Sequence, residues 1–194
     1  MDGQLVIYHG YQLPDGRWLR QLHYDEIQEI KPKRHDIVKL EDVLIWVKNH
    51  AIGLALDIKN GFGFESHIFQ LARDRIEAHN LDEQVVLMGW DHQSLLKVKQ
   101  CNPIITTLAL LRGRPVNLVH MVQSAQADAV NLDADIVCQY DVDALHEAGI
   151  AVVLAEMISP DFSRPVKLNA DVVCCKDPKT ARIEIQQYLS STTS

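Results

Sequence analysis

The chain has 194 residues, of which 47% are hydrophobic and 23% charged, and its formal net charge is −7. This composition predicts one soluble domain of ordinary size and argues against nucleic acid or an anionic membrane as the main partner. No apolar run approaches the roughly 20 residues of a membrane-spanning helix, and residues 1–10 lack the pattern of a secretory signal. We expect a cytoplasmic protein whose four cysteines are reduced and lie in the core.

A helix-like segment runs directly into a strand-like segment in the first third of the chain. Apolar residues recur at positions i, i+3, i+4 and i+7, which predicts an amphipathic helix. These residues are Leu40, Val43, Leu44 and Val47. The apolar run 53–56 is typical of a strand buried on both faces of a parallel sheet, and Asp57 and Lys59 follow it. Folds of the α/β class place their catalytic groups at such strand ends.

The remaining chain alternates between strand-like and helix-like runs. Strands are predicted over 53–59, 84–90, 103–110, 128–133, 150–156 and 170–176. Helices are predicted over 64–79, from 92, over 116–126 and 142–148, and from 178. Several residues are expected at helix ends: Asp91 and Asp141 as N-caps, Pro115 just before a first turn, Gly149 after a last turn, and Asp177 at the start of the last helix. The run 160–167 is expected to be a loop.

Alternating strands and helices with short connections predict a parallel sheet in one domain over residues 1–189, followed by a polar, frayed tail over 190–194. A doubly wound nucleotide-binding sheet needs a glycine fingerprint after its first strand. Gly61 and Gly63 are present, but Ser66 stands where the third glycine belongs. Polar residues instead follow most predicted strands, as at the catalytic face of a (β/α)8 barrel. Some of them are also expected as helix caps.

Segments in this order and spacing resemble the glycerophosphodiester phosphodiesterase family. Residues 40–44 resemble its L-E-D/E-V/L-L helix start, and residues 53–59 resemble its L-x-E/D-x-K strand. The other similar segments are 2–9 (D-G-x-L-V-x-x-H), 85–95, 103–110, 146–150 and 171–178. The resemblance therefore covers most of the chain. It implies a TIM-type (β/α)8 barrel of the phospholipase C-like phosphodiesterase kind.

The chain also departs from the family pattern. The family begins with a strand carrying H-R-G and a second strand carrying E-x-D, and this sequence contains neither. Six strands are predicted where a barrel has eight. With about 30 residues for each strand–helix unit, we expect an N-terminally incomplete barrel that lacks its first two strands, roughly 40–60 residues. Two open sheet edges would favour a homo-oligomer.

The resemblance implies hydrolysis of a glycerophosphodiester to an alcohol and glycerol 3-phosphate, and a role in lipid metabolism. His9 is implied as the acid or base, Asp57 as a ligand of a divalent metal (Mg²⁺ or Ca²⁺), and Lys59 as the phosphate-binding cation. Trp90 and Glu156 are expected in the pocket wall. Because the other expected ligands would lie upstream, we expect an incomplete metal site in residues 1–194.

Two other functions stay open. The chain could be a catalytically degenerate barrel that acts as a binding or interaction protein. It could also be a sugar-phosphate or decarboxylase-type barrel, because Asp57-Ile58-Lys59 resembles the D-x-K strand end of orotidine monophosphate decarboxylases. Phe62 stands where that family has a second aspartate. On the residues alone, His9 could also be an ordinary strand-end histidine, and Asp57 with Lys59 an ordinary ion pair.

Overall fold

The computed structural model describes residues 2–30, 37–59, 67–155 and 161–192. Its main feature is a six-stranded parallel sheet in which every strand pairs with the next one along the chain. The strands are β3 (Leu54–Asp57), β4 (Val85–Gly89), β5 (Thr106–Leu110), β6 (Ala129–Asp133), β7 (Ala151–Ala155) and β8 (Val172–Val173). This order is that of a barrel rather than a doubly wound sheet, and it confirms the predicted fold class.

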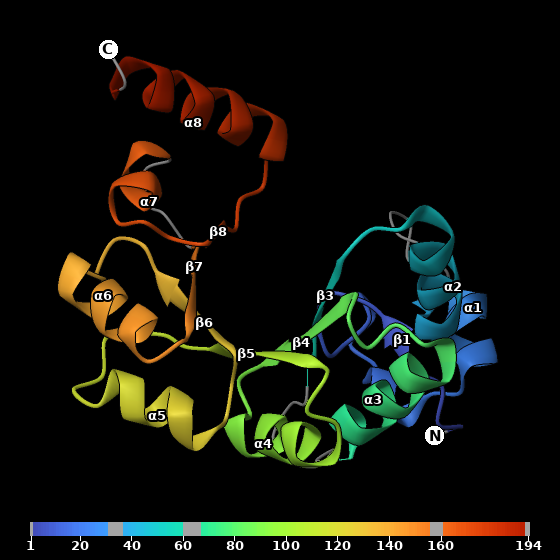
Figure 1. The fold of residues 1–194 in the computed structure, drawn as a ribbon. Coiled ribbons are helices and arrows are strands. Elements are labelled where there is room, and N and C mark those ends of the chain that lie inside the picture. The colour runs from blue at the N-terminus through green and yellow to red at the C-terminus, as the bar shows by residue number, and fades with distance from the viewer. Residues whose placement is uncertain (1, 31–36, 60–66, 156–160, 193–194) are drawn as a thin grey trace.

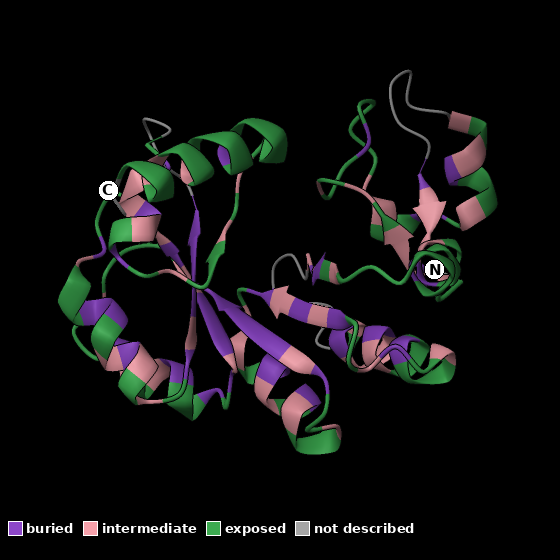
Figure 2. Ribbon diagram, turned by 45° about the horizontal axis from the view of Figure 1, so that its top comes forward, coloured by how far each residue is buried: buried purple, intermediate pink, exposed green. Residues whose placement is uncertain are grey.

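Helices connect the strands and cover the outer side of the curved sheet (Figure 1). They are α3 (Ile68–His79), α4 (His92–Cys101), α5 (Leu118–Ser124), α6 (Gln139–Glu147), α7 (Ser163–Lys167) and α8 (Pro178–Thr192). Buried positions concentrate in the strands and on the helix faces turned toward them (Figure 2). Within the described residues, no helix is both long enough and apolar enough to cross a membrane.

The residues before β3 form a smaller layer beside that strand. It contains β1 (Val6–Ile7), the 3-10 helix η1 (Leu19–Gln21), α1 (Tyr24–Ile30), β2 (Val38–Lys39) and α2 (Leu40–His50). Strands β1 and β2 pair antiparallel. A separate apolar cluster holds this layer together: Leu13, Leu22, Ile27 and Ile37. Helix α2 joins the main core instead, because Leu40, Leu44 and Val47 are buried as the sequence predicted.

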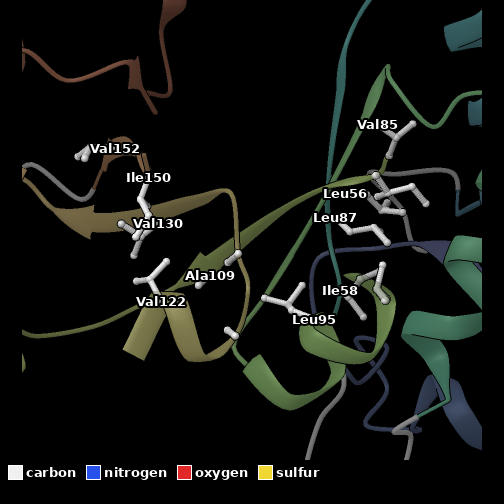
Figure 3. Close-up of a cluster of buried hydrophobic side chains, with 14 of the residues drawn as sticks. Leu56, Ile58, Val85, Leu87, Leu95, Ala109, Val122, Val130, Ile150 and Val152 are labelled. Atoms are coloured by element: carbon white, nitrogen blue, oxygen red, sulfur yellow. The ribbon is translucent and has the colours of Figure 1, made fainter. Parts of the chain in front are cut away.

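Side chains alternate between two faces of the parallel sheet. One set packs against the helices, and Figure 3 shows several of its members: Leu56, Ile58, Val85, Leu87, Ala109, Val130 and Val152. The other set lies on the concave face and forms a second, smaller cluster: Leu108, Leu110, Ala129 and Val153, with Val86, Met88 and Ala151 beside them. The carboxyl ends of all six strands meet at one rim of this concave face.

The prediction that residues 53–56 are buried on both faces was wrong. Ala55 is exposed and Leu54 is only half-buried, whereas Leu56 is buried. The reason is that β3 is an edge strand, which pairs only with β4 among the described strands. Leu54 and Ile58 donate their N–H groups to Gln84 and Met88 on the β4 side. By alternation, the N–H and C=O groups of Ala55 point away from β4.

Several predicted helix ends were confirmed. The Asp91 carboxylate accepts hydrogen bonds from Ser94 N (3.1 Å) and Ser94 Oγ (2.7 Å) at the start of α4. Asp177 caps α8 in the same way through Thr180. Gly149 has φ +75° directly after the last turn of α6.

Other local predictions were wrong. Helix α5 begins at Leu118 rather than next to Pro115, with Asn117 as its N-cap. Residues 163–167 form α7 instead of a loop, because a proline is tolerated in a first helical turn. Residues 190–192 continue α8 rather than forming a frayed tail. None of the four cysteines is in the core, since Cys101 ends α4 and Cys174 and Cys175 follow the edge strand β8.

Asp141 lies in the third position of α6 and not at its N-cap, because the helix begins two residues earlier, at Gln139. Its carboxylate accepts hydrogen bonds from Arg114 Nε (2.8 Å) and from the N–H of Cys138 (2.9 Å). Burial alone would raise the pKa of Asp141, but these hydrogen bonds outweigh burial, so the pKa lies below its ordinary value.

This lowered pKa sets a pH dependence of stability. The charged carboxylate stabilises the fold above the pKa of an unfolded aspartate, about 3.9, and the contribution is lost as the pH falls toward the lower folded pKa. We expect Asp141→Asn to reduce the free energy of unfolding by about 1–3 kcal/mol at neutral pH. The difference from the wild type should shrink below about pH 4 in urea titrations. A difference that is constant with pH would contradict this assignment.

The edge position of β3 is tested by proline substitutions at neighbouring residues. Ala55→Pro removes an N–H group that points away from β4, so we expect it to change the free energy of unfolding by less than about 1 kcal/mol. Leu54→Pro removes the hydrogen bond to Gln84. It should lower the free energy of unfolding by about 1–3 kcal/mol more than Leu54→Ala, which controls for loss of the side chain. Similar costs for Ala55→Pro and Leu54→Pro would mean that the outer edge of β3 is paired.

The same variant reports on self-association. An edge strand with outward N–H and C=O groups favours pairing between copies of the chain. If copies of the chain pair along this edge, Ala55→Pro should lower the fraction of oligomer measured by light scattering at the same protein concentration. An unchanged oligomer fraction would exclude β3 as the associating edge.

Candidate active site

Three of the predicted site residues line one cavity of about 660 Å³. Asp57 and Lys59 come from the carboxyl end of β3, and His9 comes from the segment directly after β1. Most of the remaining wall is apolar, with Leu5, Leu22, Leu40, Leu54 and Leu71 among its residues. The cavity therefore lies between the exposed edge of β3 and the smaller N-terminal layer.

Asp57 and Lys59 form an ion pair at the rim of the concave face. They are two residues apart on an extended segment, so both side chains project to the same side. Lys59 Nζ donates a hydrogen bond to Asp57 Oδ2, and the two side chains are 27% and 29% exposed. Asp57 Oδ1 is buried and has no hydrogen-bond partner in the described part of the chain. A buried carboxylate oxygen without a partner is costly unless something satisfies it.

A divalent cation would satisfy this oxygen, but the described residues do not form a site for one. Mg²⁺ and Ca²⁺ take at least six oxygen ligands, usually from more than one carboxylate. Over residues 2–30, 37–59, 67–155 and 161–192, no group of three or more His, Cys, Asp or Glu side chains is close enough to hold a metal. Asp57 thus has the chemistry of one ligand without the rest of a ligand set.

The other two predicted site residues lie elsewhere or outside the described residues. Trp90 follows β4 and is 44% exposed, but it is not part of the cavity wall. Its ring faces Arg112 instead, with the guanidinium carbon 5.4 Å from the ring centroid. Glu156 belongs to the residues that are not described. The sequence analysis did not single out Arg112 as a site residue. Its place two residues beyond β5 was the available signal.

A close contact fixes the end of β4, which carries Trp90. Gly89 lies against the fully buried ring of Phe69 on α3. A Cβ atom at Gly89 would lie 2.6 Å from Phe69 Cζ, which is shorter than any normal contact. The absence of a side chain at Gly89 therefore lets α3 pack directly under the rim.

We expect Gly89→Ala to lower the free energy of unfolding by about 1–3 kcal/mol, because the buried ring must move. Phe69→Leu shortens the opposing side chain. In the Phe69→Leu variant, Gly89→Ala should lower the free energy of unfolding by less than it does in the wild type. The double-mutant cycle, measured by denaturant unfolding, should give a coupling energy above about 0.5 kcal/mol. Additive costs would show that the ring does not limit the space at Gly89.

No protein-family model matches the chain, and no curated protein matches it in sequence. Solved structures do match its fold. A protein from Galdieria sulphuraria that carries the provisional name glycerophosphodiester phosphodiesterase has a TM-score of 0.81 and 21% identity, over 96% of this chain and 80% of its own. The glycerophosphodiester phosphodiesterase from Parabacteroides distasonis has a TM-score of 0.78 and 14% identity, over 98% and 80%.

A third similar structure is a phosphodiesterase from Oleispira antarctica in complex with the product sn-glycerol-3-phosphate. It has a TM-score of 0.80 and 17% identity, over 95% of this chain and 81% of its own. The TM-scores establish the fold, whereas identities this low leave the activity of this chain to be argued from its own residues. Over nearly its whole described length, the chain has the fold of the glycerophosphodiester phosphodiesterases.

Proposed function

We propose that the chain belongs to the glycerophosphodiester phosphodiesterases and binds the phosphate group of a glycerophosphodiester at the rim of its concave face. The observation that carries this proposal is the Asp57–Lys59 pair at the carboxyl end of β3, in which one carboxylate oxygen has no partner among the described residues. The fold supports it, because the similar structures named above are phosphodiesterases. One of them was solved with sn-glycerol-3-phosphate.

Each residue of the proposed site has a separate task. Lys59 places a positive charge at the strand end, where it attracts the phosphate oxygens. Asp57 fixes the position of that ammonium group through their hydrogen bond. His9 lines the same cavity from the N-terminal layer, and an imidazole there can give a proton to the leaving alcohol oxygen. Cleavage also needs water to attack phosphorus and give up a proton to a base, and charge neutralisation and protonation of the leaving group are the contributions that Lys59 and His9 can make.

Phosphate binding is tested with sn-glycerol 3-phosphate and two lysine variants. Lys59→Ala removes the proposed phosphate-binding charge, so we expect the Kd from calorimetry to rise at least about tenfold. Lys97→Ala on the exposed side of α4 makes the same change in net charge and should leave the Kd unchanged. Equal effects of the two variants would mean that only overall charge matters, and the proposed site would be wrong.

Catalysis is a separate question, because the described residues bring no three His, Cys, Asp or Glu side chains together, whereas a hard cation needs several oxygen ligands. For residues 1–194 we therefore expect weak binding of Mg²⁺ and Ca²⁺. Turnover of glycerophosphocholine should not differ from that of Asp57→Ala. Choline release with and without each metal is the measurement. Metal-dependent release that disappears in Asp57→Ala would show that the chain completes its own metal site.

A binding protein without catalytic activity is the second candidate. The lack of a group of three potential metal ligands among the described residues favours it, because phosphate binding through Lys59 needs no metal. Binding of sn-glycerol 3-phosphate without turnover is the outcome that this candidate predicts. The decarboxylase alternative gains no support from the similar structures.

A further inference from the structure

The register of the sheet brings Lys59 and Trp90 to the same level of the rim. Asp57 pairs with Met88, and Met88 pairs with Leu108 on the next strand. Partners in a parallel sheet face the same side, and Met88 and Leu108 belong to the concave cluster. Two residues further along, just beyond the ends of β3 and β4, the same alternation directs Lys59 and Trp90 toward the concave side on which Leu110 lies.

Arg112 follows Leu110 by another two residues and lies over the Trp90 ring. The guanidinium carbon is 5.4 Å from the ring centroid, which is within the range of a cation–π contact. Both side chains are exposed to solvent, so a ligand at the rim can reach them. The indole ring holds the guanidinium in place while leaving its N–H donors available to a ligand.

The positive charge of Arg112 differs from that of its neighbours in one respect. Lys59 is paired with Asp57, and Arg114 is paired with Asp141 at 2.8 Å. Among the residues described, no carboxylate lies within ion-pair distance of Arg112. An aromatic ring binds a cation without cancelling its charge. The rim beside the proposed phosphate site therefore keeps one full positive charge that is free to act on a ligand.

We propose that Arg112, held by Trp90, selects the head group of the diester in favour of anionic groups and against quaternary ammonium groups. This inference rests on the proposed function, because it places the phosphate near Lys59 and the head group next to Trp90. A guanidinium offers several N–H donors to a phosphate or carboxylate. A choline group normally binds to an aromatic face, but here that face already carries a cation.

The experiment compares three diesters that share the glycerol phosphate and differ in head-group charge. They are glycerophosphocholine, glycerophosphoglycerol and glycerophosphoinositol 4-phosphate. Dissociation constants for the 194-residue chain are measured by calorimetry at low ionic strength, because salt screens an exposed charge. We expect the phosphorylated inositol diester to bind about tenfold more tightly than glycerophosphocholine, with the neutral diester between them.

Two arginine variants test whether Arg112 is the cause. In Arg112→Gln, we expect the anionic diester to bind more weakly and glycerophosphocholine to bind more tightly, so that their ratio falls to within about twofold of one. Arg182→Gln on the exposed surface of α8 changes the net charge equally and should keep the wild-type ratio. Tighter binding of glycerophosphocholine is the informative result, because a variant that is merely destabilised would bind every ligand more weakly.

The outcomes separate the two proposals. If sn-glycerol 3-phosphate and all three diesters fail to bind, the proposed function and the proposed head-group selection are both wrong. If sn-glycerol 3-phosphate binds through Lys59 but the three diesters bind alike, only the role of Arg112 is wrong. A wild-type ratio that survives Arg112→Gln would also overturn it. Trp90→Ala, which removes the platform, should reduce the ratio in the same direction as Arg112→Gln.

Discussion

The hydrogen-bond register between β3, β4 and β5 is the constraint on which the candidate site depends. Because side chains alternate, a shift of one residue would turn Asp57 and Lys59 toward the helices and bring Leu56 and Ile58 to the rim. Burial of apolar side chains prevents this shift. Each buried leucine or isoleucine in the helix-side core contributes roughly 1.5–3 kcal/mol, which a slipped strand would lose. The polar rim is thus held in place by the apolar face behind it.

Two positively charged side chains at this rim, Lys59 and Arg112, are held in place by different kinds of contact. Lys59 is compensated by a carboxylate, which fixes the ammonium group but lowers its net effect on a distant anion. Arg112 is held by an aromatic ring, which fixes the guanidinium, and its charge has no carboxylate partner in the described part of the chain. The two residues therefore suit different parts of one ligand. Lys59, whose ammonium group is fixed by Asp57, suits the phosphate, which is the same in every diester. Arg112 suits the head group, whose charge differs from one diester to another.

Much of this architecture was predictable from the sequence, because the periodicity of apolar residues reports burial directly. The six strands, the buried face of α2 and the caps at Asp91 and Asp177 follow from patterns within a few residues. The exposure of Ala55 did not follow, since an apolar run carries no sign of whether a strand is central or at an edge.

The contact between Trp90 and Arg112 was also beyond the sequence. It depends on the register of two strands separated by a helix, and local patterns do not encode that register. The same limit applied to Asp141, whose carboxylate bonds to the N–H of Cys138 and to Arg114 from the preceding loop instead of capping the helix that was predicted to follow it. Sequence patterns located the elements and the Asp57–Lys59 pair, and tertiary pairing decided the rest of the site.

The order of strands in the sheet also has a consequence for how the chain folds. Because each of the six strands pairs with the next one in sequence, each pairing in the sheet spans one strand–helix unit, from 19 residues (Val153 with Val172) to 31 residues (Leu54 with Val85). Closing one such unit costs less chain entropy than pairing the first strand with the last would, although every pairing of a parallel sheet is non-local. Each strand–helix unit can dock on the unit before or after it, as in repeat proteins. Among the described strands, β3 and β8 do not pair with each other, so the pairings of this sheet can form one after another between neighbouring units.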